Sequence, residues 1–205
     1  MDQQETAGKG TERLAARDLV TVGIFTALYL VFMMVGGAFF ASNPVLTFWM
    51  PASVALLTGP IYLLLIAKVP KHGPLIVVGV VEGLFLFATG MYWGWAVACV
   101  VLGIAADIIA GIGRFRSKAL NFAAFVVYSL SPMGSYLMLW ANPTGYASYL
   151  VGKGAEQAYM DTMMSTATDW MLPAMVLATV ACAIISGLLG MRLLHRQFEK
   201  AGITA

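Results

Sequence analysis

The sequence predicts an all-α membrane protein with six transmembrane helices and both termini in the cytoplasm. Apolar residues make up 60% of the 205 residues and charged residues 11%, whereas soluble domains are about 45–50% apolar and about 25% charged. One soluble core could not cover this much apolar surface, so the composition favours a bilayer. The apolar residues also gather into six runs, and nearly all basic residues lie on one side of those runs.

Each apolar run is long enough to cross the ~30 Å hydrocarbon core as a helix, and 73–90 is the shortest. Turn-forming residues at 42–44, 69–73 and 142–145 separate several of the runs. Prolines inside the runs are compatible with membrane helices, because neighbouring helices satisfy the freed carbonyl groups. The predicted spans are 19–41, 44–67, 73–90, 92–113, 119–141 and 168–191.

In this arrangement, eleven of the twelve basic residues fall on one side of the membrane. Lys153 alone falls on the other side, in a segment that also carries Glu156, Asp161 and Asp169. Cytoplasmic loops of membrane proteins are enriched in Lys and Arg, so the basic side and both termini are expected to be cytoplasmic. The residues on that side are Lys9, Arg13, Arg17, Lys68, Lys71, Arg114, Arg116, Lys118, Arg192, Arg196 and Lys200.

One membrane domain is expected over 18–195, between a polar lead-in over 1–17 and a cytoplasmic tail over 196–205. The polar start and the long first apolar run argue against a cleavable signal peptide. Residues 142–167 form one long outer segment, in which 155–164 is predicted to be a short amphipathic helix that lies on the membrane or caps the bundle.

Motifs of several enzyme classes are missing from the sequence. The chain has no G-x-x-x-x-G-K-[ST], H-E-x-x-H or G-x-S-x-G motif, so it lacks these signatures of ATPases, zinc proteases and serine hydrolases. Cys99 and Cys182 both lie in apolar runs and give no metal-ligand spacing. No catalytic residue, metal site, resident cofactor or nucleic-acid partner is expected.

Two acidic residues lie well inside the predicted spans. Glu82 is close to Gly79 and Gly83, a G-x-x-x-G pair that lets helix backbones approach, so it is expected to face the bundle interior. A helix-to-helix hydrogen bond and contact with a ligand both explain Glu82, and the sequence leaves the two open. Asp107 lies nearer the inner end of its span and is predicted to anchor that helix end through a structural ion pair with Arg114, with Lys68 or Lys71 as alternative partners.

The outer ends of the spans are rich in aromatic and Met side chains, whereas the inner ends have mainly Phe115 and Phe198. An interfacial aromatic belt explains many of these side chains, but such a belt is expected at both ends. The asymmetry favours an outward-facing pocket for a flat, largely apolar ligand. The candidate substrate-binding residues are Phe39, Asn43, Trp49, Met50, Glu82, Tyr92, Trp93, Trp95, Tyr136, Trp140 and Asn142.

Small residues in the first span form a candidate contact face. Gly23 and Ala27 lie four residues apart, and small residues of this kind drive helix contacts in lipid. The face would serve ordinary packing within the bundle or docking between chains.

The chain resembles a substrate-capture (S) component of an energy-coupling-factor (ECF) importer, a type of ABC transporter, and within that class the group labelled Trep_Strep or MptE-like. The likeness spans nearly the whole chain. It is carried by A-A-R-D at 15–18, A-K-V-P-K-H-G at 67–73, G-I-A-A-D at 103–107 and H-R-Q-F-E-K-A-G-I at 195–203.

The resemblance implies a six-helix subunit of a prokaryotic cell membrane that captures a scarce micronutrient at the outer face. A separate transmembrane coupling subunit and two cytoplasmic ATPases would drive import. An A-x-x-x-A-like face of the first helix meets the coupling subunit in that class, and Gly23 and Ala27 are the matching residues here, with Gly in place of one Ala. The implied substrate is vitamin-like or cofactor-like, with haem-like tetrapyrroles and pterin-like compounds as candidates, and haem would take its ligands from Met or Tyr.

Two other functions remain as alternatives. The first is a stand-alone secondary transporter or channel, a class in which inverted repeats are common, and no repeat is visible here. The second is an intramembrane enzyme that uses Glu82 and Asp107, the two acids well inside the spans.

Overall fold

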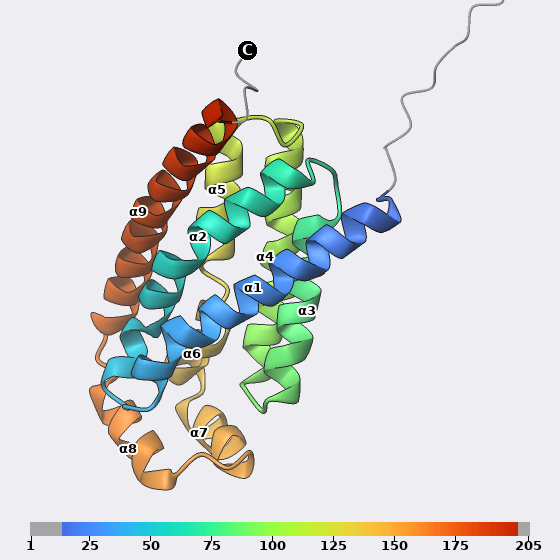
Figure 1. The fold of residues 1–205 in the computed structure, drawn as a ribbon. Coiled ribbons are helices and arrows are strands. Elements are labelled where there is room, and N and C mark those ends of the chain that lie inside the picture. Colours follow the sequence, from blue (N-terminus) through green and yellow to red (C-terminus); the bar gives the residue numbers. More distant parts are fainter. Residues whose placement is uncertain (1–13, 201–205) are drawn as a thin grey trace, which may run out of the picture.

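The computed structural model describes residues 14–200, with side chains over 14–193, and this part of the chain is a bundle of helices (Figure 1). Predictions that involve 1–13 or 201–205, including the basic residues Lys9 and Arg13, lie outside the described residues. The helices are α1 (Ala16–Ala41), η1 (Leu46–Trp49), α2 (Met50–Lys68), α3 (Pro74–Ala88), α4 (Trp93–Ile112), α5 (Lys118–Tyr128), α6 (Met133–Ala141), α7 (Pro143–Gly152), α8 (Gln157–Thr166) and α9 (Met171–Lys200).

All six predicted runs are helical, but two differ from simple spans. Four segments are long and apolar enough to cross a membrane: α1, Leu46–Lys68, α4 and Met171–Leu193. The bent pair α5 and α6 counts as a fifth candidate span, with 42° between the two helices. The run at 73–90 forms the shorter apolar helix α3, of 15 residues. The described chain therefore has four or five candidate membrane spans by length and composition.

The predicted span 119–141 is interrupted at Ser129–Pro132 because of proline chemistry. Pro132 has no backbone N–H and a fixed φ, so it is poorly tolerated inside a helix but suits the start of one; here it is the N-cap residue of α6. Tight turns satisfy the freed groups: the N–H of Ser131 donates to the Tyr128 carbonyl at 3.0 Å, and Ser129 Oγ donates to the Val126 carbonyl at 2.7 Å.

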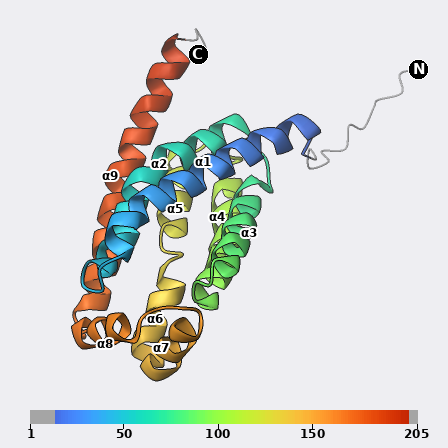
Figure 2. The same ribbon diagram turned by 60° about the horizontal axis from the view of Figure 1, so that its bottom comes forward.

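The two ends of the described bundle differ in charge, and only one of them is covered by short helices. Figure 2 shows that α1 begins and α9 ends at the same end, whereas α7 and α8 cover the opposite end. The α2–α3 and α4–α5 turns lie with the start of α1 and the end of α9 (Figures 1 and 2). We call this the basic end, because Lys68, Lys71, Arg114, Arg116 and Lys118 lie in or beside those turns, and we call the other the capped end. Lys153 follows α7 at the capped end.

Glycines allow α3 and α4 to pack with their backbones in contact. A Cβ added to Gly79 would collide with the carbonyl oxygen of Cys99, and one added to Gly83 would come within 2.8 Å of the carbonyl oxygen of Ala96. The predicted G-x-x-x-G contact is thereby confirmed, with α4 as its partner. Side chains larger than hydrogen at these positions would force the two helices apart.

Buried side chains form two hydrophobic clusters stacked along the bundle. The cluster nearer the basic end is built on aliphatic and aromatic residues of α1, α2, α3, α4, α5 and α9, with Tyr62 and Tyr128 among its largest members. The cluster nearer the capped end is rich in Met and aromatic residues, including Met160 and Met163 of α8. Because α7 and α8 contribute to this second core, they are an integral part of the fold.

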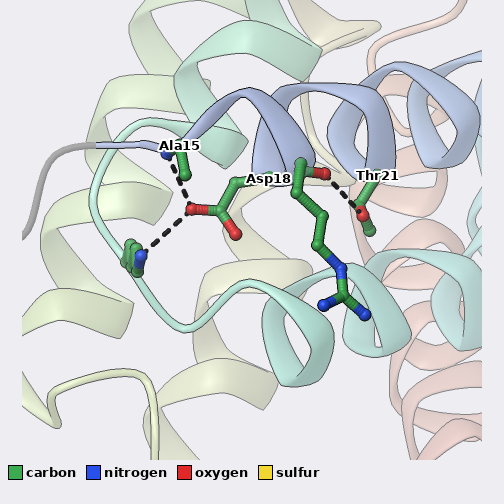
Figure 3. A network of polar contacts seen from close by, with 5 residues as sticks. Ala15, Asp18 and Thr21 are labelled. Carbon is green, nitrogen blue, oxygen red and sulfur yellow. Dashed lines mark hydrogen bonds and ion pairs between the residues drawn. The ribbon is translucent and has the colours of Figure 1, made fainter.

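The N-terminal end of α1 is attached to the α2–α3 turn by an ion pair. Asp18 Oδ2 accepts a hydrogen bond from the Ala15 N–H at 2.9 Å and lies 3.0 Å from Lys71 Nζ (Figure 3). Beyond this contact α1 crosses the bundle obliquely (Figures 1 and 2) and exposes many large apolar side chains, including Val20 and Ile24. Such a surface is suited to lipid or to another apolar helix.

Candidate functional site

A cavity of about 420 Å³ lies at the capped end, between the bundle and the two short helices that cover it. Its volume falls within the ~300–1,000 Å³ of typical small-molecule sites. Every element from the end of α1 to α8 contributes except α3 and α5. The lining residues are Ala41, Ser42, Thr47, Met50, Met91, Tyr92, Trp95, Ser135, Tyr136, Tyr146, Leu150, Ala155, Glu156, Tyr159, Met160 and Met163.

Hydroxyl groups in the lining connect the covering elements to the bundle. Tyr136 of α6 donates to the Thr47 carbonyl at 2.7 Å, and its hydroxyl lies 2.8 Å from Thr47 Oγ1. Ser135 Oγ lies 3.3 Å from the hydroxyl of Tyr146 on α7. Tyr159 of α8 donates to the Ala41 carbonyl at the end of α1, at 2.8 Å. The cavity is therefore held in shape by hydrogen bonds from three different tyrosines.

Tyr146 of α7 and Tyr159 of α8 remain protonated near neutral pH. Burial raises the pKa of Tyr146 to about 12, and burial also raises the pKa of Tyr159. A neutral phenol donates one hydrogen bond and accepts others, so these side chains bring hydrogen-bonding capacity to the cavity without charge.

Aromatic rings form one wall of the cavity around Tyr92. The Tyr92 ring lies 5.0 Å from the Tyr146 ring and 5.1 Å from the Tyr149 ring, centroid to centroid. Trp95, one turn further along α4, is also part of the lining, and its buried Nε1 has no hydrogen-bond partner among the described residues. Buried N–H groups nearly always have a partner in native proteins, so this indole is a candidate donor to a bound molecule.

Four of the predicted substrate-binding residues line the cavity: Met50, Tyr92, Trp95 and Tyr136. The other predicted aromatic residues do not. Phe39 is 80% exposed on α1 and Trp93 is 45% exposed on α4, so both face the surroundings of the bundle. Trp49 and Trp140 pack beside the hydrophobic cluster nearer the capped end, and the Trp140 ring makes an edge contact with Phe48 at 6.3 Å.

The two predicted asparagines bond to nearby backbone N–H groups instead of lining the cavity. Asn43 Oδ1 accepts hydrogen bonds from the N–H groups of Val45 and Leu46, at 2.9 and 3.1 Å. Asn142 Oδ1 accepts from the N–H of Gly145 at 3.0 Å and caps α7. Asn is favoured at such positions because its side chain satisfies a free backbone N–H, which explains both residues without a ligand.

Glu82 is bonded to a neighbouring helix and lies outside the cavity lining. The hydroxyl of Tyr128 on α5 donates to Glu82 Oε2, and both side chains are almost completely buried. The Tyr128 ring stacks on Tyr62 at 5.1 Å and meets the edge of Tyr29 at 5.8 Å. The sequence left two explanations open, and the contact seen here is the first of them, a hydrogen bond between two helices.

Asp107 anchors the α2–α3 turn, which corrects the predicted pairing with Arg114. Asp107 Oδ2 lies 2.7 Å from His72 Nδ1, and Oδ1 accepts a hydrogen bond from the Gly73 N–H at 3.0 Å. Arg114 is exposed and has a φ of +50° in the turn after α4. Among the described residues no ion pair joins Arg114 to Asp107, whose partners come instead from the turn before α3.

The sequence-based prediction missed the contribution of the covering helices. Tyr146, Tyr159, Met160 and Met163 all line the cavity, and they come from the outer segment 142–167, which supplied only Asn142 to the predicted site. The predicted amphipathic helix over 155–164 corresponds to α8, which caps the bundle. The sequence signal for this role was the presence of Met and Tyr residues within an otherwise polar segment.

The capped helical bundle and its small-molecule-sized cavity define a polytopic membrane protein with a candidate binding site at one end. Residues 16–200 match the family Trep_Strep, described as "Hypothetical bacterial integral membrane protein". The chain belongs to this family and is therefore a multi-pass integral membrane protein of bacteria. No curated protein and no solved structure matches the chain.

Proposed function

We propose that the protein is the membrane-embedded substrate-capture subunit of an ECF importer. In this proposal the cavity at the capped end holds one vitamin-like or cofactor-like molecule on the outer side of the membrane. The observation that carries the proposal is the cavity itself. It has a volume of about 420 Å³, is lined by aromatic, Met and hydroxyl side chains, and is covered by two helices that contribute to the hydrophobic cluster nearer the capped end.

Further support comes from the location of the cavity and of the basic residues. The cavity lies at the end opposite the basic turns, and the positive-inside rule favours a cytoplasmic location for such turns. The cavity would then open away from the cytoplasm, as capture from outside the cell requires. The six-span arrangement with cytoplasmic termini belongs to this proposal, with α3 as the third span and the bent α5–α6 pair as the fifth.

The exposed side of α1 is the proposed docking face for the coupling subunit. Gly23 and Ala27 are both exposed, and a Cβ added to Gly23 would meet nothing within 4 Å. Two small residues on an open, apolar helix surface allow another helix to approach closely. The importer would comprise this chain, a transmembrane coupling subunit and two cytoplasmic ATPases.

Retained small molecules and co-purifying subunits test this proposal directly. The full chain, purified from its native membrane, is expected to carry one organic molecule per monomer in native mass spectrometry. ATPase and coupling subunits are expected to co-purify in mild detergent. A chain that retains no molecule and associates with no ATPase under these conditions would refute the proposal.

The broken α5–α6 element favours a second candidate, a stand-alone secondary transporter, because discontinuous helices line substrate paths in that class. Proteoliposomes that contain only this chain separate the two candidates. Uptake driven by an ion gradient, without any ATPase, would establish the second candidate, whereas binding without uptake fits the capture subunit.

A further inference from the structure

The charge of the cavity is negative within the described part of the chain. Its lining contains no Lys, Arg or His, and Glu156 is the charged residue among the lining residues. The Glu156 carboxylate does not cap α8 and makes no hydrogen bond or ion pair with any described residue. An unpaired carboxylate at the rim of a cavity attracts positive charge.

The segment that covers the cavity carries a net negative charge. Between 142 and 170, three carboxylates, of Glu156, Asp161 and Asp169, accompany the single amine of Lys153. Lys153 is outside the lining, and its Nζ lies 5.8 Å from the centroid of the Tyr149 ring. The field over the cavity mouth therefore favours cations over anions.

The walls of the cavity suit the same kind of ligand. Five aromatic side chains line it, from Tyr92, Trp95, Tyr136, Tyr146 and Tyr159. Aromatic faces attract organic cations through their quadrupole, and groups of such faces recognise quaternary ammonium compounds. Met side chains add polarizable, adaptable surface. The contact of Lys153 with Tyr149, whose ring packs on Tyr92, is an example of this attraction at the edge of the cavity.

We propose that the substrate of this cavity is a flat organic cation, a nitrogen heterocycle or ammonium compound with a permanent positive charge. The inference deepens the proposed capture function and rests on it. It disfavours both substrate candidates that the sequence raised. Haem-like tetrapyrroles carry carboxylates that need basic partners, and pterin-like compounds are uncharged. Trp95 Nε1 would donate to an acceptor atom on the ligand.

Three probes of similar shape and different charge test the proposal. The full chain is placed in nanodiscs of phosphatidylcholine, and binding of N-methylquinolinium, methylnaphthalene and naphthoate is measured by equilibrium dialysis against empty nanodiscs. The quinolinium cation is expected to bind tightest, about tenfold more tightly than the naphthoate anion, from the combined carboxylate and ring attraction.

Matched variants identify the groups responsible. Glu156→Gln should weaken quinolinium binding by about fivefold and leave methylnaphthalene binding unchanged. Asp161→Asn, in the helix that follows Glu156 but outside the lining, should change neither. Tyr92→Leu should weaken quinolinium binding by about threefold or more, and Tyr92→Phe should restore it because the ring is kept. Lys153→Gln should not weaken the binding of any probe.

Several results would overturn the inference. They are tighter binding of naphthoate than of quinolinium, no binding of any probe, equal binding of all three, or loss of binding in Lys153→Gln without loss in Glu156→Gln. If the purified chain also retains an anionic molecule from its native membrane, the capture function stands and the cationic substrate fails. If it retains no molecule and associates with no ATPase, the capture function itself fails.

Discussion

The hydrogen bond between Glu82 and Tyr128 is expected to hold α3 against α5, and a double-mutant cycle measures its contribution. Glu82 is 2% exposed and Tyr128 is 0% exposed, so loss of one partner leaves the other polar group buried and unpaired, at a cost of about 1–3 kcal/mol. Interhelical hydrogen bonds in membrane proteins couple by about 0.6 kcal/mol on average and by up to about 1.7 kcal/mol. Complete burial places this pair near the upper value.

The variants are Glu82→Leu, Tyr128→Phe and the double variant, with free energies of unfolding measured by SDS titration in mixed micelles. Each single variant should lose about 1–3 kcal/mol. The double variant should be more stable than the sum predicts, by about 1.5 kcal/mol. Thr179→Val is a control, because Thr179 is buried but donates to the Met175 carbonyl within its own helix, so it should not couple to Tyr128→Phe.

The cycle also separates a structural role of Glu82 from a ligand contact. Glu82→Gln should retain the native small molecule, because Glu82 is outside the cavity lining. A coupling energy close to zero, with stable single variants, would refute the reasoning about the bond. Loss of the small molecule in a well-folded Glu82→Gln variant would place Glu82 in the binding site.

Three further predictions concern the two ends of the bundle and the exposed side of α1. Asp107→Asn should destabilise the protein by about 1–3 kcal/mol in the same SDS titration, because the carboxylate holds both His72 and the start of α3. Stability should fall as pH rises from about 10 to about 12, since the phenol of Tyr146 ionises first in the unfolded chain; Tyr146→Phe should remove this component of a pH titration of unfolding. Gly23→Leu should leave stability within about 0.5 kcal/mol of wild type and abolish co-purification of the coupling subunit in a pull-down, whereas Val20→Leu should preserve it.

The sequence was sufficient to locate the long apolar helices, but not α7, the break between α5 and α6, or the faces that the helices present to one another. The apolar runs and turn residues located α1, α2, α3 and α4 and the apolar part of α9, because a helix must present a long apolar stretch to cross a bilayer. Along α1 and α4 apolar residues occur on all sides, so periodicity cannot show that Tyr92 and Trp95 face the cavity while Phe39 and Trp93 face outward.

The partners of the polar residues depended on turns whose geometry a single sequence does not give. The short turn before α3 brings His72 to Asp107, and the break before Pro132 sets where Tyr128 ends α5 beside Glu82. Both contacts join residues more than thirty positions apart. Spacing along one helix, which suggested Arg114 for Asp107, carries no information on such long-range contacts.

The short length of α3 has a consequence for the lipid around the protein. Its 15 residues extend over about 22 Å at ~1.5 Å per residue, less than the ~30 Å thickness of a typical hydrocarbon core. In the six-span arrangement, acyl chains beside α3 would have to compress, or polar headgroups would have to bend inward. We therefore expect bilayers of shorter acyl chains to stabilise the protein, and a thick membrane to favour an arrangement in which another protein covers α3.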